Sequence, residues 1–233
     1  MSETTMLRRV LVLLSGGMDS TTALVDCVHD PAVAEIMALF VDYGQRHIIE
    51  FLSATSIAAR YGVQLTRLDL TAFGSQVNSV LTGAGEVPHG HYTAATMAQT
   101  VVPNRNATML MAAAGIAASH GLTEVVTAVH AGDHAIYPDC RPEFMDAVSK
   151  AAQLGCGVGV RAPFVHSSKA DIARTGARLS VPFELTWSCY EGKLGGHCGR
   201  CGTCVERAEA FFEAGVDDPT VYRDPDFWRQ ATA

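Results

Sequence analysis

The chain has 233 residues, and 48% of them are hydrophobic, which is enough to bury the core of one domain with a small appendage. The net charge of −7 argues against nonspecific binding to nucleic acid, because such binding draws most of its affinity from a basic surface. No apolar run comes near the roughly 20 residues of a membrane-spanning helix, and the run at residues 10–14 is too short for the apolar core of a signal peptide. We therefore expect a cytoplasmic protein with neither nucleic acid nor a membrane as a partner.

Short apolar runs alternate along the chain with segments of helical periodicity. The apolar runs predict strands at residues 8–14, 36–41, 64–70, 124–130 and 158–164. The periodic segments predict helices at residues 21–29, 47–61, 107–120, 142–154 and 168–179. Asn106 is a candidate N-cap, and Ser168 with Asp171 is a candidate capping box. This alternation predicts an α/β fold, an open parallel sheet with helices on both faces.

A polar, glycine-rich turn follows the first predicted strand and consists of Ser15, Gly16, Gly17, Met18, Asp19 and Ser20. Ligands of open parallel sheets bind beyond the carboxyl ends of the strands, where this turn lies. Its two glycines let several backbone N–H groups face one anion, and the following helix adds the partial positive charge of its N-terminus. The turn is neither a Walker A sequence nor a dinucleotide motif. Because phosphate would repel Asp19, we expect this residue to act through Mg²⁺ or as an N-cap.

Four of the seven cysteines lie close together, at Cys189, Cys198, Cys201 and Cys204. Four thiolates satisfy tetrahedral Zn²⁺, so we expect one structural Zn²⁺ per chain, held in a glycine-rich knuckle with no open position for catalysis. An iron–sulfur cluster is the alternative, because Cys-x-x-Cys-x-x-Cys is also a cluster spacing. We expect His197, inside the motif, to be an exposed loop residue. Cys27 and Cys156 are expected to be small buried residues.

Several further strings accompany the turn, at residues 42–47, 103–106, 130–134, 137–144, 168–171 and 187–190. The turn itself resembles the pyrophosphate loop of the ATP pyrophosphatases, which cleave ATP between its α- and β-phosphates and leave AMP on the substrate. Together the strings resemble the 7-cyano-7-deazaguanine synthase family of the queuosine pathway, from about residue 10 to residue 204. The Tyr-Pro-Asp-Cys-Arg string at residues 137–141 and the cysteine motif are the most specific parts of this resemblance.

The resemblance implies an ATP-dependent ligase that converts 7-carboxy-7-deazaguanine and ammonia into 7-cyano-7-deazaguanine. An acid becomes a nitrile through an amide by two dehydrations, and adenylation turns each departing oxygen into AMP. The implied partners are ATP with Mg²⁺, ammonia and the deazaguanine acid, and the implied assembly is a homodimer. One alternative is an ATP-dependent tRNA thiolase, or another amide-forming adenylating enzyme, that shares the loop. Another is a non-catalytic module whose knuckle binds protein or nucleic acid.

The candidate site residues come from these strings. We expect catalysis to depend on two loop residues and on two cations that stabilise charge at the phosphates or the acyl-adenylate, namely Asp19, Ser20, Arg105 and Lys169. We expect ATP to contact Leu14, Ser15, Gly16, Gly17, Met18, Asp19, Ser20, Thr21, Thr22, Ala23, Leu24 and Asp42. The N–H donors on the edge of a guanine-like ring favour carboxylates. Substrate binding is therefore expected at Asp133, Asp139 and Glu143, with Arg141 beside them.

Three further residues of the strings carry reactive side chains. Cys140 is expected to be a packed cysteine, because the reaction needs no covalent thiol. His130 and His134 would either transfer protons near neutral pH or serve only in packing. We expect a nucleotide-binding domain at residues 1–185, followed at residues 186–233 by the zinc-binding knuckle with a C-terminal helix and tail.

Overall fold

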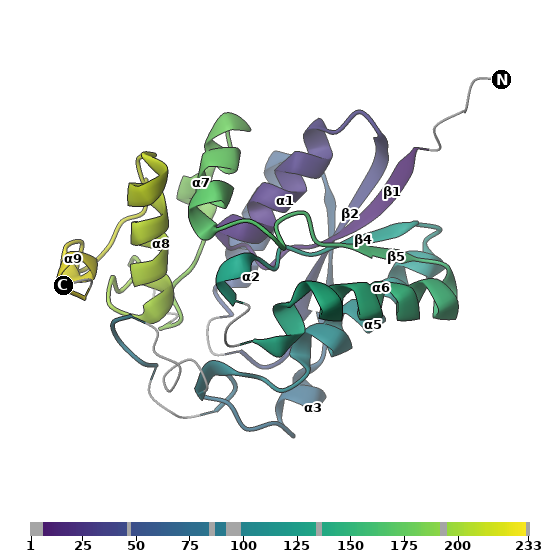
Figure 1. Ribbon diagram of the computed structural model, residues 1–233, viewed down its shortest axis with the longest axis horizontal. Helices are drawn as coiled ribbons and strands as arrows, with labels where there is room; N and C mark the ends of the chain where they lie inside the picture. Colours follow the sequence, from purple (N-terminus) through teal and green to yellow (C-terminus); the bar gives the residue numbers. More distant parts are fainter. Residues whose placement is uncertain are drawn as a thin grey trace.

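The computed structural model describes residues 7–45, 48–83, 87–91, 99–133, 137–191 and 195–231. Within these residues one parallel sheet contains the strands Arg8–Leu13 (β1), Val33–Asp42 (β2), Gln64–Asp69 (β3), Glu124–Val126 (β4) and Gly159–Arg161 (β5). The strands lie in the order β3-β2-β1-β4-β5, and all neighbours are parallel (Figure 1). This is the open parallel sheet that the sequence predicts.

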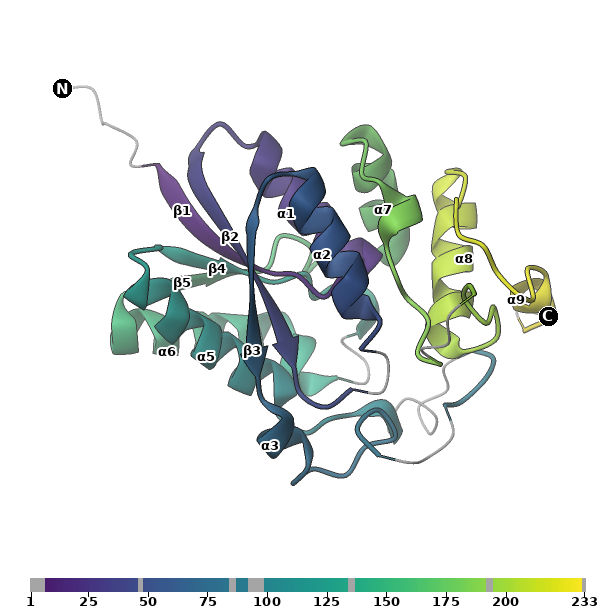
Figure 2. The ribbon, with the colours of Figure 1, turned by 180° about the vertical axis from the view of Figure 1, so that it is seen from behind.

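Helices cover both faces of the sheet, as Figures 1 and 2 show from opposite sides. One face carries Met18–His29 (α1), Glu50–Arg60 (α2) and Lys169–Arg178 (α7), and the other carries Arg105–Ser119 (α5) and Pro142–Cys156 (α6). Alternate residues of β1 serve the two faces: Val10 and Val12 pack with α1 and α2, whereas Leu11 and Leu13 pack with α5 and α6. Because both faces are covered, the central strands are apolar without interruption.

The start of α5 differs from the sequence-based expectation. The helix begins at Arg105, and its N-cap is Asn104, in the left-handed conformation with φ 56°. The prediction that Asn106 caps this helix is therefore wrong. The Asn106 side-chain amide donates instead to the backbone oxygen of Asp139 at 3.1 Å and to the Sγ of Cys140 at 3.2 Å. Asn106 thus joins α5 to the segment at residues 137–141.

The predicted capping box of α7 is confirmed. The Ser168 hydroxyl accepts a hydrogen bond from the backbone N–H of Asp171 at 3.1 Å, and the Asp171 carboxylate accepts one from the backbone N–H of Ser168 at 2.9 Å. Two otherwise unpaired N–H groups at the helix start are satisfied in this way. The cap fixes the first turn of α7, which carries Lys169.

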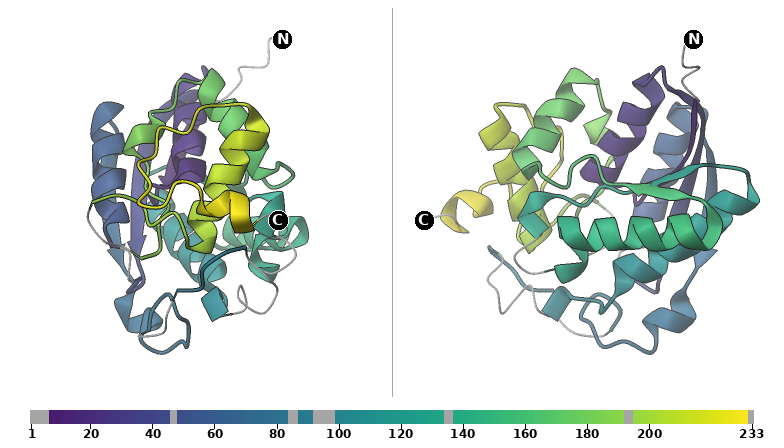
Figure 3. Two further views of the ribbon diagram at one scale, coloured as in Figure 1. Left: turned by 90° about the vertical axis from the view of Figure 1, so that its left-hand side faces the viewer. Right: turned by 45° about the vertical axis from the view of Figure 1, so that its right-hand side comes forward.

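The C-terminal segment packs beside the α/β layers. Gly202–Ala214 (α8) lies next to α7, and Phe227–Ala231 (α9) lies beyond it at the edge of the molecule (Figure 3). Short helical turns occur in the connections, at Thr71–Gly74 (α3), Ala131–Asp133 (η1), Pro138–Cys140 (η2) and Phe183–Leu185 (η3). Among the helices of the described ranges, none combines the length and the apolar character that a membrane crossing requires.

The order in which strands are added to the sheet changes sides between β1 and β4. From β1 the chain adds β2 and β3 on one side and then returns to add β4 and β5 on the other. The loops that leave the carboxyl ends of β1 and β4 therefore diverge, and such a switch point is where open α/β sheets bind their ligands. Residues 14–20 and 127–133 border this crevice.

Candidate active site and metal centre

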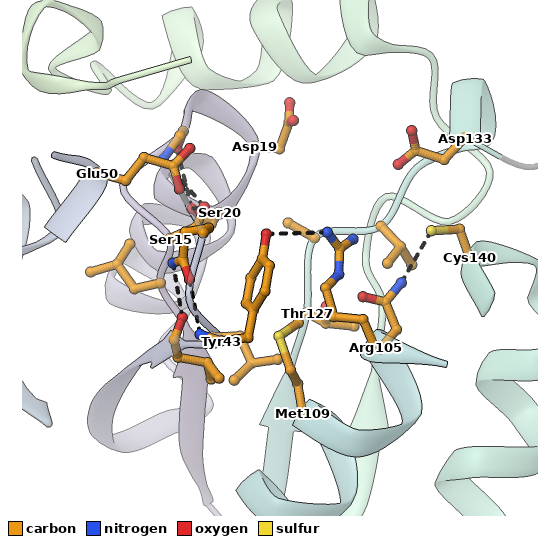
Figure 4. A pocket seen from close by; sticks show the side chains of 18 of the residues that line it. Ser15, Asp19, Ser20, Tyr43, Glu50, Arg105, Met109, Thr127, Asp133 and Cys140 are labelled. Carbon is orange, nitrogen blue, oxygen red and sulfur yellow. Dashed lines mark hydrogen bonds between the residues drawn. The ribbon is translucent and has the colours of Figure 1, made fainter. Parts of the chain in front are cut away.

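A cavity of about 250 Å³ lies at the switch point, formed by the segments after β1, β2 and β4 and the starts of α2 and α5 (Figure 4). Its walls are apolar at Leu39, Val41 and Met109 and polar at Ser15 and Arg105. A second cavity of about 130 Å³ adjoins it and shares with it Asp19, Arg105, His130, Asp133, Cys140 and Tyr190. A concave site that combines apolar walls with convergent polar groups suits a small molecule.

The glycine-rich turn is held tightly against the neighbouring helix. Gly16 has φ 86°, and a Cβ atom there would lie 2.6 Å from the backbone oxygen of Glu50, so only glycine permits this approach. The Ser15 and Ser20 hydroxyl oxygens lie 3.0 Å apart at the cavity wall. The N-cap of α1 is Gly17. Of the two roles expected for Asp19, the role of N-cap is therefore wrong. The turn presents hydroxyls and a helix N-terminus to the cavity, as an anion site requires.

Lys169 lies among carboxylates at the smaller cavity. Its Nζ is 2.8 Å from the Glu206 Oε2 and 3.4 Å from the Asp19 Oδ2. Burial opposes charge on this amine, but Asp19, Glu206 and Asp133 outweigh the burial and raise the pKa of Lys169 above its usual range. Lys169 is therefore a cation at neutral pH. The second carboxylate oxygen of Asp19, Oδ1, is buried without a hydrogen-bond partner, which leaves an acceptor for a cation such as Mg²⁺.

Arg105 is the second cation of the site. Its Nη1 lies 3.5 Å from the Tyr43 hydroxyl, and its guanidinium carbon lies 5.6 Å from the centroid of the Tyr43 ring. Within the described ranges no carboxylate forms an ion pair with Arg105, and its Nε is buried without a partner. A buried guanidinium with an unused donor at a cavity wall suits a bound anion.

The structure separates the predicted ATP residues into three groups. Leu14, Ser15, Gly17, Asp19 and Ser20 line the larger cavity, and Gly16 shapes the turn. The remaining helix positions are buried within or beneath α1, at Met18, Thr21, Thr22, Ala23 and Leu24. Asp42 is buried outside both cavities, where it pairs with Arg67 and accepts the Gly44 N–H at 2.9 Å. The turn therefore meets the cavity, whereas the helix interior supports it.

The predicted substrate residues separate as well. Asp133 lines both cavities, and burial raises its pKa above the usual range of an aspartate. Asp139 accepts the backbone N–H of Asn106 at 3.1 Å, Glu143 is exposed, and Arg141 is half-buried outside both cavities. Of these four residues, the structure brings Asp133 to the site.

The two remaining reactive groups of the described site are Cys140 and His130. Cys140 is buried and accepts from Asn106, as expected for a packed cysteine, and burial raises the pKa of its thiol. His130 is buried at the cavity wall. His134 lies outside the described residues.

Several residues at the cavities were not predicted from the sequence. Tyr43 and Tyr190 line the larger cavity, and both fall inside motif strings, which could have indicated them. Thr203 and Glu206, at the start of α8, line the smaller cavity. No pattern in the sequence indicated Glu206, because only the fold places the start of α8 beside the start of α7.

The four cysteines are arranged as ligands of a single ion. Their Sγ atoms all lie within 4.8 Å of one another, with separations of 3.9 Å between Cys198 and Cys204 and 3.4 Å between Cys201 and Cys204. Zn–S bonds of about 2.3 Å at tetrahedral angles place sulfur atoms about 3.8 Å apart. An iron–sulfur cluster, in which each thiolate binds a different iron, would hold the sulfur atoms further apart. The group therefore fits one tetrahedral metal ion.

The expectation of an exposed His197 is wrong. The side chain is buried, its Nε2 accepts the Ser188 N–H at 2.9 Å, and its ring lies on Trp187 with centroids 4.4 Å apart. Burial and the nearby Arg207 lower the pKa of His197 to about 4, so the neutral ring acts as an acceptor inside the knuckle. The expectation of buried cysteines holds for Cys27 but is wrong for Cys156, which is exposed at the end of α6.

The segment that carries the four cysteines also touches the glycine-rich turn directly. The backbone N–H of Trp187 donates to the backbone oxygen of Gly16 at 2.9 Å. Trp187 stands two residues before the ligand Cys189, and Tyr190, which lines the larger cavity, stands one residue after it. Together with Glu206, these contacts make the C-terminal segment part of the site.

Comparison with known proteins agrees with this geometry. Residues 9–215 match the family model described as "Queuosine biosynthesis protein QueC". The chain belongs to this family. Among its relatives, the 7-cyano-7-deazaguanine synthase of Brucella canis is 50% identical over 231 residues, which cover 96% of this chain and 97% of the relative. That of Brucella anthropi is 48% identical over 228 residues, with the same two coverages.

A solved structure also resembles this QueC-family chain in its fold. The NMN synthetase from Francisella tularensis superposes with a TM-score of 0.50 at 15% sequence identity, over 97% of this chain and 85% of that one. At this identity the similarity concerns the fold alone. It agrees with the open parallel sheet described above.

Proposed function

We propose that the protein is a 7-cyano-7-deazaguanine synthase, which uses ATP and ammonia to convert 7-carboxy-7-deazaguanine into the corresponding nitrile. The observation that carries this proposal is the pair of adjoining cavities, in a chain of the QueC family. The Ser15–Ser20 turn lines the larger cavity, Lys169 lines the smaller one, and Arg105 lines both. The names of the relatives at 48–50% identity support the substrate assignment.

Each group of the site has a role in this reaction. The hydroxyls of Ser15 and Ser20 and the start of α1 bind the phosphates, and Asp19 holds the Mg²⁺ that accompanies ATP. Arg105 and Lys169 stabilise negative charge as pyrophosphate leaves and the acyl-adenylate forms. Because AMP is a much better leaving group than water, adenylation permits nitrogen to replace oxygen. Contacts of Asp42, Asp139, Arg141 and Glu143 with ligands remain predictions.

The four cysteines hold one structural Zn²⁺ in this proposal. A closed set of four protein ligands leaves no position for substrate, so the ion acts by ordering the knuckle. We propose a boundary near residue 185, between a nucleotide-binding domain at residues 1–185 and a zinc-binding segment at residues 186–233. A cytoplasmic location and a homodimeric assembly, both expected from the sequence, remain predictions.

The proposal is tested by following pyrophosphate and AMP. Purified protein with ATP and Mg²⁺ is offered the deazaguanine acid with ammonia, the synthetic 7-amido compound without ammonia, or unmodified tRNA. We expect nitrile and AMP from the first two and no turnover with tRNA. An inert amide would exclude the two-stage scheme, and turnover with tRNA alone would favour the thiolase alternative.

Metal analysis tests the ion separately. We expect a colourless protein with about one zinc per chain. A brown protein that contains iron and sulfide would contradict the zinc assignment.

A further inference from the structure

We propose that Asp133 is the catalytic residue that accepts the N–H protons released when nitrogen replaces oxygen, and that His130 is the residue that positions it. This inference rests on the proposed function, since it assigns the proton transfer of that same reaction. Asp133 lines both cavities and lies across the larger one from the Ser15–Ser20 turn (Figure 4). It therefore faces the space in which the activated carbonyl would lie.

The short turn η1 fixes the geometry of this pair. The backbone N–H of Gly132 donates to the Nδ1 of His130 at 3.2 Å, so Nδ1 is the unprotonated nitrogen and Nε2 carries the hydrogen. Nε2 lies 3.6 Å from the Asp133 Oδ2. His130 is 3% exposed, and a Cβ at residue 132 would lie 3.0 Å from its ring. The imidazole is thus held in one tautomer beside one oxygen of Asp133, a residue that lines both cavities.

The other titratable groups named at the cavities have other partners or roles. Asp19 faces Lys169 at 3.4 Å and holds Mg²⁺ in the proposed function. Lys169 is a cation among Asp19, Glu206 and Asp133 and has no lone pair to offer. Glu206 accepts from Lys169 at 2.8 Å, and burial keeps the Cys140 thiol neutral. Glu50 lies beside the turn at the opposite end of the cavity (Figure 4). Within the described part of the chain, Asp133 is thus the carboxylate best placed to receive a proton.

In the amide-forming step, ammonia displaces AMP from the acyl-adenylate. The lone pair of ammonia forms a bond to the carbonyl carbon of the acyl-adenylate, and the carbonyl electron pair moves to oxygen. The Asp133 carboxylate takes one proton from the nitrogen, the oxygen electron pair returns, and the bond to AMP breaks. The products are the amide, AMP and protonated Asp133, which passes its proton to solvent. A second ATP adenylates the amide oxygen with release of pyrophosphate. The bond from carbon to that oxygen then breaks with loss of AMP, and Asp133 accepts in turn the two further N–H protons whose departure leaves the nitrile.

The decisive variant is Asp133→Asn, which keeps the size of the side chain and removes its basicity. We expect pyrophosphate release from ATP and the acid in a single turnover to stay within about twofold of wild type. Amide formation with ammonia should fall by about 10²–10⁴-fold, the usual contribution of a general base. Hydroxylamine, whose nitrogen is less basic and releases its proton more readily, should still capture the acyl-adenylate at near the wild-type rate. Asp146→Asn, at an exposed position of α6, is the matched control and should leave every step unchanged.

The alternative role of Asp133, recognition of the deazaguanine ring, gives the opposite pattern. In that case the variant would need far more acid to release pyrophosphate, and the bound adenylate would react with ammonia normally. Either that pattern or an unchanged ammonia step would overturn the proposal. If wild-type protein releases no pyrophosphate with the acid, the proposed function itself fails, and this outcome is distinct from a defect confined to the ammonia step.

His130 is tested by a conservative rescue. His130→Gln can still present an N–H toward Asp133, whereas His130→Ala cannot. We expect the Ala variant to slow the ammonia step by about tenfold without changing pyrophosphate release, and the Gln variant to recover most of the loss. Equal defects in both variants, or a loss of pyrophosphate release in both, would show that His130 serves only in packing.

Discussion

The sheet region and the knuckle are stabilised in different ways. In the sheet region the central strands are buried by apolar side chains, and Val10, Leu11 and Val12 are each 0% exposed. In the knuckle the buried cluster consists of the four cysteines, with Trp187, Tyr190 and Tyr222 only partly buried around it. Apolar burial of about 25 cal/mol per Å² can order the first region. The cysteine cluster at residues 187–204 has no apolar core of this kind, so we expect a bound metal ion and polar contacts to order it.

Arg207 is the main polar contact of the knuckle. Its side chain is fully buried and donates to the Thr186 hydroxyl at 2.7 Å, to the Phe183 backbone oxygen at 3.2 Å and to the Asp218 carboxylate at 3.2 Å. It thereby joins α8 to the segment before the first metal ligand and to the C-terminal tail. Because the knuckle also brings Tyr190 and Glu206 to the cavities, the region with the weaker core completes the active site.

Removal of one of the four cysteines should separate the stability of the sheet region from that of the knuckle most strongly. Structural zinc contributes about 10–16 kcal/mol in small peptide sites, which is as large as the whole stability of a domain, about 5–15 kcal/mol. We expect Cys201→Ser to disorder residues 187–215 and lower solubility, while β1, β2 and β4 keep their hydrogen-exchange protection. The control Cys156→Ser replaces an exposed cysteine and should change nothing. A Cys201→Ser protein that lacks metal yet stays soluble and fully active would contradict a structural role of the site.

The polar contacts of the knuckle are tested through Arg207. Replacement by Met removes the cation that faces Asp218, although Asp218 keeps the Thr220 N–H and the Tyr222 hydroxyl as donors. Removing one member of a comparable buried ion pair costs about 3–5 kcal/mol. We expect denaturant unfolding to show this loss in the free energy of unfolding. Backbone hydrogen exchange should become fast first in α8. Arg174→Met removes an exposed pair on α7 and should cost less than about 1 kcal/mol. Equal losses in the two variants would mean that Arg207 is no more important than a surface arginine.

The turn should show the converse, a loss of activity without a loss of structure. We expect Ser15→Ala and Asp19→Ala each to lower turnover by about 100-fold, because the first removes a donor to the phosphates and the second removes the carboxylate that would hold Mg²⁺ beside them. The midpoint of thermal unfolding should stay close to that of wild type. Ser56→Ala, on the exposed side of α2, is the control. Wild-type pyrophosphate release in both turn variants would rule out adenylation at this turn.

The smallest effect is expected at Glu206, where the two regions meet. Glu206→Gln removes one carboxylate that raises the pKa of Lys169, so this pKa should fall. Lys169 would then lose its proton at a lower pH, and the alkaline limit of activity should move to lower pH. At neutral pH we expect about a tenfold loss, near the lower end for a hydrogen bond to a charged group. Glu213→Gln, exposed on the same helix, should leave the pH profile unchanged.

The sequence predicted the sheet and the turn well for a physical reason. Strands buried on both faces form continuous apolar runs, and a phosphate-binding turn needs glycine and hydroxyl residues at consecutive positions. The errors concern contacts between distant segments. Asn106 resembles a cap but bonds to Asp139, and His197 lies in a glycine-rich stretch yet packs on Trp187. Glu206 reaches the cavity only because α8 packs beside α7, which no local pattern encodes.

The dependence of the active site on the knuckle is tested most directly by removing the metal from wild-type protein with a chelator. Hydrogen exchange and pyrophosphate release from ATP with the deazaguanine acid are then measured on the same sample. We predict rapid exchange in residues 187–191 and α8, retained protection in β1 and β2, loss of pyrophosphate release, and recovery of both properties when zinc is restored. Wild-type pyrophosphate release from metal-free protein with a disordered knuckle would contradict the account.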